Sequence, residues 1–321
     1  MKTDKQQYYA KDTVQVYGNL TLDEELVTDG LVGLQIQTPA DKLLTIRTVY
    51  TGSPPSETPY VYVMYVLPCD QSGNPKYSFN RGTLAHFKIR VTNADIQPRE
   101  ALMPINTYYN DSTPFGFAAI QTTITEGSSP TFIIDIPIPV DAVLGTATAY
   151  ANAYTDYPKL NGTPYCSEVN ATFQITASGS GGGSQTTQNS FTTLQSNETG
   201  NFQLTFKLPK KIPVGNCTVY VTSRYFGESV SNSTTFEVFI LGDLGGPVNY
   251  IPTFFAFDGK VDGYDLALFI QCYKELAPPE AMYLGDLGGP VNYVPTFFAY
   301  DGKVDGYDLA LFIQCYKGLG P

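Results

Sequence analysis

The feature that most constrains this chain is a nearly perfect internal repeat in its C-terminal quarter. The 34-residue segment 241–274 recurs as 284–317, and the copies differ only at Ile251/Val294 and Phe257/Tyr300. A short connector, ELAPPEAMY, joins them. One such unit is too small to bury its own apolar face, so the two copies are predicted to stack as a single module.

Each copy carries a group of aspartates that leads into a helical pattern. The string DGKVDGYDLALF contains Asp258, Asp262 and Asp265, with counterparts Asp301, Asp305 and Asp308. Carboxylates this close repel one another unless a hard cation holds them, and Ca²⁺ prefers several oxygen ligands. The competing interpretation is that the aspartates only cap helices and form turns. Duplication of the whole pattern favours the metal site. After Asp262, the apolar residues Leu266, Phe269, Ile270 and Tyr273 follow helical spacing.

The duplicated string LGD…DGKVDGYDLALF resembles a dockerin domain, the paired half-EF-hand module of secreted assemblies. The resemblance covers residues 241–321 and implies two Ca²⁺ ions, one per copy. The implied ligands are Asp243, Asp258, the backbone carbonyl of Lys260, Asp262 and Asp265 in the first copy, and Asp286, Asp301, the carbonyl of Lys303, Asp305 and Asp308 in the second.

The sequence departs from the dockerin pattern in one respect, which makes the assignment of two of these ligands less secure. Fourteen residues, 244–257, separate Asp243 from Asp258, where the usual loop has three. Asp243 and Asp286 are therefore less secure than the other six aspartates, and Asn249 or Asn292 could take the place of a missing ligand.

The dockerin resemblance also implies a protein partner, a cohesin-like receptor. It places recognition at the start of each helix, on Gly263, Tyr264, Gly306 and Tyr307. The inserted segments hold an aromatic–proline cluster that is either additional core or an exposed binding face. Its members are Tyr250, Pro252, Phe254 and Phe255, with Tyr293, Pro295, Phe297 and Phe298 in the second copy.

Everything before the repeat has the pattern of β structure. Period-two alternation or β-branched runs bounded by turn residues predict a series of short strands, which favours β sandwiches. The predicted strands are 13–20, 31–37, 43–50, 60–67, 84–92, 116–125, 131–137, 146–155, 168–176, 201–208, 217–224 and 234–240. The Gly/Ser-rich stretch 178–188 is a flexible linker by composition.

The β region resembles the macroglobulin-like or immunoglobulin-like modules of prokaryotic, particularly archaeal, surface proteins. The resemblance rests on YAKDTVQVYGNLTLDEELVTDGLVGLQIQ near the start and TGNFQLTFKLPKKIPVGNCTVYVTSRYFGESVSNSTTFEV near the end. It implies a discontinuous sandwich, 1–56 with 185–240, into which a second sandwich, 57–180, is inserted. Two sandwiches in series are the alternative. The predicted fold class is thus mainly β, with two immunoglobulin-like sandwiches and a two-helix calcium-binding module at 241–321.

Several features point outside the cell. Seven Asn-x-Ser/Thr sequons all lie before the repeat, more than chance gives for this composition. They begin at Asn19, Asn110, Asn161, Asn170, Asn197, Asn216 and Asn232. The polar opening residues lack the apolar stretch of a signal peptide, so we expect the signal sequence to lie outside this numbering. No apolar run is long enough to span a membrane.

The five cysteines do not have the spacing of a zinc site. Cys69 and Cys166 fall in the inserted sandwich and are predicted to form a disulfide. Cys272 and Cys315 occupy equivalent positions in the two copies and are expected to be buried, unpaired thiols.

The charge balance and the scarcity of catalytic residues exclude other classes. The net charge is -11, and residues 242–321 contribute 4 basic and 10 acidic side chains to it, so the acidity is concentrated in the repeat. An acidic chain does not suit nucleic-acid binding. There is one histidine (His86) and no motif of a hydrolase, metalloprotease or phosphate-binding loop. No enzyme is predicted.

The leading hypothesis is a glycosylated, non-enzymatic extracellular assembly protein at the cell surface, attached to a partner through its calcium-binding tail. One alternative is a subunit that polymerises with copies of itself into a filament or surface layer, with residues 1–10 adding a strand to a neighbour's sheet. A second alternative is a carbohydrate-binding accessory module, in which tyrosines of the segment YVYVMY (60–65) stack on sugars.

Overall fold

The computed structural model describes residues 1–177, 200–248, 251–254, 257–291, 294–298 and 300–317. The regular structure of these residues is mainly β, with two α-helices, α1 (Gly263–Tyr273) and α2 (Gly306–Tyr316), as predicted. The chain forms two compact units. Unit 1 comprises Met1–Gln6, Thr13–Pro209 and Cys217–Phe236, and unit 2 comprises Gln7–Asp12, Lys210–Asn216 and Glu237–Pro321. The predicted linker 178–188 lies outside the described residues.

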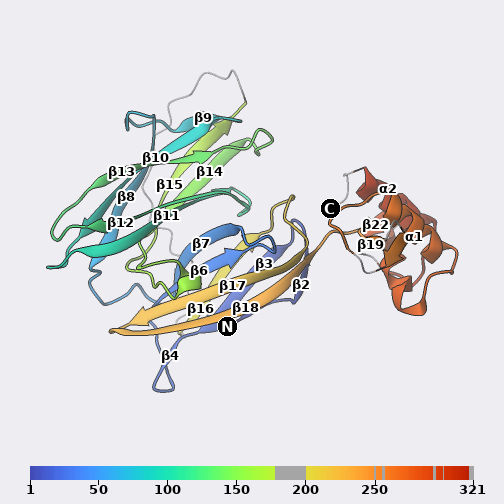
Figure 1. Cartoon of the computed structure of the whole chain (residues 1–321), viewed down its shortest axis with the longest axis horizontal. Coiled ribbons are helices and arrows are strands. Elements are labelled where there is room, and N and C mark those ends of the chain that lie inside the picture. Colours follow the sequence, from blue (N-terminus) through green and yellow to red (C-terminus); the bar gives the residue numbers. More distant parts are fainter. Residues whose placement is uncertain (178–199, 249–250, 255–256, 292–293, 299, 318–321) are drawn as a thin grey trace. The chain divides into compact units, whose positions relative to one another are not determined.

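Strands from the two ends of the β region pair with each other (Figure 1). We call β1, β3–β7 and β16–β18 the terminal strand group. One of its sheets has the order β1-β3-β16 and another contains β18-β17-β6-β7, with a small β4–β5 hairpin beside them. The bounds are β1 (Lys2–Thr3), β3 (Thr13–Asn19), β4 (Thr21–Leu22), β5 (Glu25–Leu26), β6 (Leu31–Gln37), β7 (Leu43–Tyr50), β16 (Asn201–Lys207), β17 (Gly215–Tyr225) and β18 (Glu228–Phe239).

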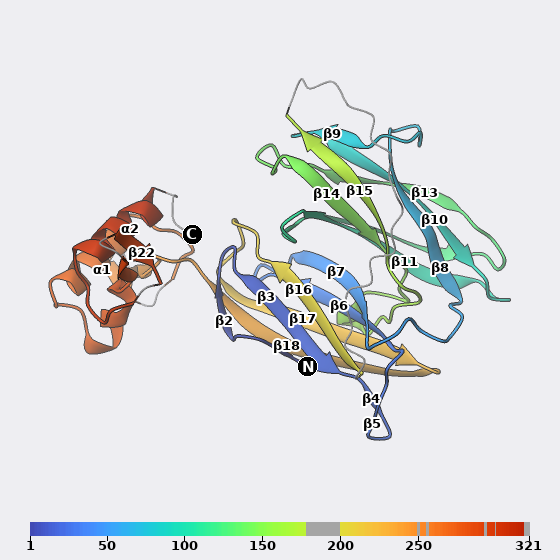
Figure 2. The ribbon, with the colours of Figure 1, turned by 180° about the vertical axis from the view of Figure 1, so that it is seen from behind.

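The intervening residues form a second set of sheets, which we call the inserted strand group (Figure 2). Its sheets have the orders β13-β10-β8 and β12-β11-β14-β15-β9. The bounds are β8 (Val61–Cys69), β9 (Ser78–Asn80), β10 (Leu84–Asn93), β11 (Arg99–Tyr109), β12 (Pro114–Ile124), β13 (Thr131–Pro137), β14 (Gly145–Ala151) and β15 (Val169–Thr176).

One hydrophobic core lies between the two sheets of the inserted group. Phe87 and Ile89 of the smaller sheet and Ile105 and Phe173 of the larger one belong to the same buried cluster. Every second residue of β10 is buried, which is the alternation expected of a strand with one face on a core. The coarse prediction of layered β structure is therefore confirmed, whereas immunoglobulin-like topology stays a prediction.

All twelve predicted strands are present. The short strands β1, β2 (Gln7–Tyr9), β4, β5 and β9 were missed, as was the long strand β11. The sequence pattern argues against a strand there because Pro104 interrupts the run, and proline cannot donate to a β ladder. The structure shows why it is tolerated. The β14 ladder covers only Ile105–Tyr109, so Pro104 lies just outside it and the missing N–H removes no regular rung.

A buried polar network joins the two strand groups within unit 1. The Arg47 guanidinium of β7 contacts the Glu168 carboxylate, with Nη2 and Oε2 2.9 Å apart, and both side chains are less than one-tenth exposed. The Glu168 carboxylate also accepts a 2.7 Å bond from the Thr48 N–H. The guanidinium lies 3.6 Å from the ring centroid of Tyr150 and 4.9 Å from that of Tyr108. The two groups therefore meet through a buried, hydrogen-bonded ion pair.

The N-terminal residues considered above as a strand donor are paired within their own chain. Lys2 and Thr3 pair with Tyr17 and Val16 of β3. The strand β2 (Gln7–Tyr9) pairs in parallel with the end of β18. Donation of residues 1–10 to a neighbour would first require these ladders to open.

The predicted Cys69–Cys166 disulfide is wrong for this structure, in which both are buried free thiols. The Cys166 thiol contacts Asn152 Oδ1 at 3.1 Å and the backbone of Val63, near the start of β8. Cys69 lies six residues further along the same strand. At about 3.3 Å per residue, that separation of roughly 20 Å is far beyond disulfide reach.

Candidate metal centres in the C-terminal repeat

Each copy of the repeat folds as a β hairpin followed by a helix. The hairpins are β19 (Gly245–Val248) with β20 (Ile251–Phe254), and β21 (Gly288–Val291) with β22 (Val294–Phe297). A 3₁₀ turn, η2 (Pro279–Gly285), lies in the connector. The long insertion relative to the dockerin pattern is therefore the hairpin, which returns the chain to the point where it left.

The two copies share one core, as predicted from the repeat. Phe269 and Phe312 stack with ring centroids 4.7 Å apart, surrounded by Leu244, Leu268, Leu287 and Leu311. The predicted helical stripe was partly wrong. Phe269 is buried, but Ile270 and Tyr273 are 42% and 46% exposed, and Leu268 and Cys272 are buried in their place.

The aromatic–proline cluster divides between the two interpretations. Phe254 and Phe297 pack against the core. Phe298 is 42% exposed, and its ring lies 5.4 Å from that of Tyr9 within unit 2. Pro252 and Pro295 are half-buried. Tyr250, Phe255 and Tyr293 lie outside the described residues.

The glycine of each LGD string packs against the cysteine of the other copy. A Cβ on Gly285 would lie 2.7 Å from the Cβ of Cys272, and one on Gly242 would lie 3.0 Å from the Cβ of Cys315. Both thiols are free and buried, as predicted. The reciprocal contacts give the module approximate twofold symmetry and explain why small residues occupy these positions.

This packing predicts that Gly285→Ala destabilises the repeat by about 1–3 kcal/mol, because the new methyl group would overpack a rigid contact. Gly263→Ala is the matched control, since a Cβ there meets nothing within 4 Å. The thermal unfolding of the two variants should therefore differ. Equal melting temperatures would show that the Gly285 contact is not close-packed.

The first-copy aspartates converge on the start of α1. The Asp265 carboxylate accepts bonds from the N–H groups of Leu244 (2.8 Å) and Gly245 (3.2 Å) through Oδ1, and from that of Asp262 (2.8 Å) through Oδ2. Asp262 is the helix N-cap and accepts from the Tyr264 N–H. The capping interpretation is thus correct for Asp262 and Asp265, and it does not account for Asp243.

Asp243, which precedes the β19–β20 hairpin, lies close to Asp258, which follows it. Its Oδ2 accepts a 2.8 Å bond from the N–H of Gly259, next to Asp258. Gly259 has φ +78°, which favours glycine and turns this N–H toward Asp243. The Asp258 side chain accepts from the Lys260 N–H at 3.1 Å. The insertion therefore does not remove Asp243 from the cluster.

The second copy repeats these contacts. Asp308 accepts from the N–H groups of Leu287, Gly288 and Asp305 at 2.7, 3.1 and 2.8 Å. Asp286 Oδ2 accepts from Gly302 at 2.9 Å. Asp305 caps α2 through Tyr307, and Asp301 accepts from Lys303.

The remaining oxygen of each LGD aspartate is buried without a partner. Asp243 Oδ1 and Asp286 Oδ1 have no hydrogen bond among the described residues, and Asp243 is 6% exposed. Burial, together with the smaller effect of the nearby Asp265 and Asp258 carboxylates, raises the pKa of Asp243 to about 7. Burial and the Asp301 carboxylate also raise the pKa of Asp286. An unpaired buried carboxylate oxygen is costly, and a bound cation would satisfy it.

The carboxylate oxygens are donors of the type that a hard cation prefers, but in their present arrangement they do not form a complete coordination shell. In the part of the chain that is described, no three His, Cys, Asp or Glu side chains are arranged to hold a metal ion. Asp258 and Asp301 are exposed, and each would have to give up its bond from the Lys260 or Lys303 N–H to turn toward Asp243 or Asp286. The carbonyls of Lys260 and Lys303 stay predicted ligands, and Asn249 and Asn292 lie outside the described residues.

The expected partner-binding positions are accessible. Gly263 and Gly306 are exposed with open space beside them, and Tyr264 and Tyr307 are half-buried. Elsewhere, His86 pairs across strands with Asp135, with Nδ1 2.6 Å from Oδ1. None of the helices in the described residues is long and apolar enough to cross a bilayer.

Comparison with known proteins does not assign a family. No family profile matches the sequence, and no curated protein matches it. Among solved structures, the C-terminal domain of wzt has 12% identity and a TM-score of 0.32, over 44% of this chain and 86% of that one. A Paenibacillus sp. cycloisomaltooligosaccharide glucanotransferase has 14% identity and a TM-score of 0.28, over 37% of this chain and 14% of that enzyme. A Bacteroides uniformis beta-glucuronidase has 10% identity and a TM-score of 0.26, over 51% of this chain and 26% of that enzyme. Likeness at this level identifies no function.

Proposed function

We propose that this chain is a non-enzymatic extracellular assembly protein whose dockerin-like C-terminal repeat binds two Ca²⁺ ions and attaches to a protein partner. The observation that carries the proposal is the orphaned Asp243 oxygen and its equivalent on Asp286. Each lies among aspartates in a duplicated, superimposable hydrogen-bond pattern. Caps and turns satisfy the other carboxylates, and a bound cation would satisfy these two.

In each copy, the LGD aspartate would contribute its free Oδ1, and the exposed Asp258 or Asp301 would turn inward to complete the set. Asp265 and Asp308 are fixed by three N–H bonds each and would supply negative charge from a constant position. A bound Ca²⁺ ion would cross-link the hairpin to the helix in each copy. Because the helix starts carry Gly263 and Gly306, ordering of the loops would also order the proposed partner face.

Most of the sequon asparagines are accessible to a glycan, which supports the proposal of an extracellular glycoprotein. Asn19, Asn110, Asn161, Asn216 and Asn232 are exposed. Asn170 is 5% exposed on β15, paired with Tyr150 of β14, so a glycan on it would require the sheet to open. We therefore remove Asn170 from the expected glycosylation set. Asn197 lies outside the described residues.

The proposal is tested by titrating Ca²⁺ into the chelator-treated full chain by calorimetry, followed by binding to a panel of purified cohesin modules. We expect two ions per chain and cohesin binding only in Ca²⁺. The double variant Tyr264→Ala/Tyr307→Ala should lose cohesin binding and keep both ions, whereas the exposed control Tyr283→Ala should keep both activities. Absence of a Ca²⁺ signal at millimolar concentration would refute the metal sites. Calcium-dependent filaments of the pure protein in electron microscopy would instead support self-assembly.

A further inference from the structure

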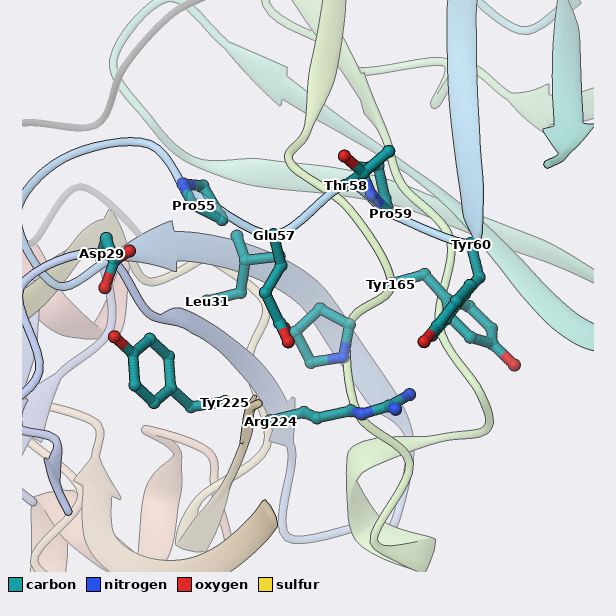
Figure 3. Close-up of a pocket in the computed structure, with 11 residues that line it drawn as sticks. Asp29, Leu31, Pro55, Glu57, Thr58, Pro59, Tyr60, Tyr165, Arg224 and Tyr225 are labelled. Carbon is teal, nitrogen blue, oxygen red and sulfur yellow. The ribbon is translucent and has the colours of Figure 1, made fainter. Parts of the chain in front are cut away.

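A pocket in unit 1 lies beside the chain segment that leads from the terminal strand group into the inserted one. Figure 3 shows its lining, which comes from four separate places in the sequence. Asp29 precedes β6, Glu57 and Tyr60 belong to the connecting segment, Tyr165 precedes β15, and Arg224 and Tyr225 end β17. Tyr60 begins the segment YVYVMY, whereas the other five residues are brought to it only by the fold.

The pocket presents tyrosine rings and a guanidinium group. Tyr60 is 44% exposed, and the guanidinium carbons of Arg224 and Arg99 lie 5.7 and 5.1 Å from its ring centroid. The Tyr165 hydroxyl donates a 3.1 Å bond to the Glu100 carbonyl, which fixes the orientation of its ring. These rings combine a flat apolar face with a polar edge, the combination that suits an amphipathic ring ligand.

Hydrogen-bonding groups of both signs face the same space. The Asp29 carboxylate is held by the Ser56 hydroxyl at 2.5 Å and by Tyr225, and the Ser56 bond lowers its pKa, so it is a fixed acceptor. By contrast, Arg224 and Glu57 form no ion pair with any described residue. Both residues line the pocket, and Figure 3 shows the Glu57 side chain extending toward the side of the pocket where Arg224 lies. Two acceptors and a five-donor cation are therefore available to a ligand.

The mixture of charges narrows the class of ligand. A simple anion would be repelled by Asp29 and Glu57, and a simple cation by Arg224. A neutral ligand with adjacent hydroxyl groups can donate to the carboxylates, accept from the guanidinium and lie against the tyrosines. The cavity volume is about 60 Å³, which accommodates part of one ring. The pocket therefore suits the terminal ring of a chain-like ligand better than a small ligand that is completely enclosed.

We propose that the pocket formed by Asp29, Glu57, Tyr60, Tyr165, Arg224 and Tyr225 binds the terminal residue of a neutral saccharide. The site is independent of the metal centres, because none of its residues belongs to the repeat. A saccharide site on the β region would let the molecule contact a glycan while the repeat contacts protein.

The test is saturation-transfer NMR and calorimetry on the full chain with three neutral trisaccharides, built from glucose, galactose and mannose. Glucuronate and lysine serve as charged comparators. We expect at least one trisaccharide to bind, with its terminal ring receiving the strongest transfer. Arg224→Gln and Tyr60→Ala should each weaken binding about tenfold, the loss expected for a bond to a charged group or for a stacking face.

Tyr283→Ala is the matched control, an exposed tyrosine outside the pocket, and it should bind like the parent chain. Circular dichroism of each variant checks that the fold is kept. The proposal is overturned if no trisaccharide binds at roughly 10 mM, well above the dissociation constant of a specific site. It is equally overturned if only the charged comparators bind, or if the pocket variants bind as well as the control. None of these results bears on the calcium proposal, which can fail or succeed separately.

Discussion

Replacing Asp243 and Asp286 together by asparagine should abolish the stabilisation of the repeat by Ca²⁺ and, at the same time, stabilise the metal-free protein. The two effects have opposite signs because the same oxygen is a ligand in one state and a buried, unpaired charge in the other. In the metal-free state, asparagine removes the charge that Asp258 and Asp265 repel. Its amide NH₂ would, however, occupy the place of the unpaired oxygen, so each site should gain less than the full cost of an unsatisfied buried group, about 1–3 kcal/mol. With Ca²⁺ at 100 times its dissociation constant, the parent chain should gain about 2.7 kcal/mol per site, and the variant should gain none.

Calorimetric melting in chelator and in Ca²⁺ measures both effects on the same samples. The parent chain should melt higher in Ca²⁺, and the double variant should melt at one temperature in either condition. Asp23→Asn, at an exposed position of the β4–β5 hairpin turn, is the matched charge control and should behave like the parent. If the asparagine variant is destabilised equally with and without Ca²⁺, the LGD aspartates only hold the Gly259 and Gly302 loops. The metal assignment would then be wrong.

Breaking the Arg47–Glu168 pair should be the most damaging single change in unit 1. Glu168→Gln keeps the shape of the side chain but leaves the Arg47 guanidinium buried without a counter-ion. Loss of one partner from such a pair costs about 3–5 kcal/mol. The midpoint of urea unfolding should fall accordingly. Because this pair joins the terminal and inserted strand groups, we also expect their unfolding transitions to separate.

Two further variants distinguish lost charge pairing from lost packing. Arg47→Met with Glu168→Leu removes both charges, and the methionine sulfur can lie against the rings of Tyr108 and Tyr150. Stability should therefore return apart from about 1–3 kcal/mol for the Thr48 N–H, which loses its acceptor. Asp41→Asn breaks the Lys159–Asp41 contact of 2.9 Å, which also joins the two strand groups but in which Asp41 is 75% exposed. It should cost less than about 1 kcal/mol. A similar loss for Asp41→Asn and Glu168→Gln would contradict the role given to burial.

Local pattern was enough to find most strands and the helix starts, because alternation and capping are properties of neighbouring residues. Asp262 and Asp305 cap their helices as their sequence context predicts. Strand β11 escaped because its proline is tolerated only through the extent of a neighbouring ladder, which the sequence of β11 does not contain. The prediction of a Cys69–Cys166 disulfide was wrong for a related reason. Both cysteines belong to the inserted strand group, but Cys166 lies beside Val63, six residues along β8 from Cys69.

In the candidate metal site, residue spacing was misleading in the opposite way: it suggested a separation that the fold removes. Counting residues between Asp243 and Asp258 made Asp243 the least secure ligand, since fourteen intervening residues suggest separation. The hairpin cancels that separation by pairing Gly245 with Phe254. The pocket residues Asp29, Glu57 and Arg224 could not have been grouped at all, because their proximity comes from sheet order rather than from spacing.

The reciprocal packing of the repeat has a consequence for how the molecule behaves at high concentration. Gly242 meets Cys315 and Gly285 meets Cys272 through the same pair of residue types, and Phe269 stacks on its own counterpart. The side chains therefore do not distinguish the copy in the same chain from the equivalent copy in another molecule. Pairing within one chain is favoured by the short connector, which keeps the effective local concentration high, and by the contact of Tyr9 with Phe298 of the second copy. Shortening the connector until the two copies of one chain can no longer meet would favour pairing between chains, as a domain-swapped dimer or an open chain of molecules.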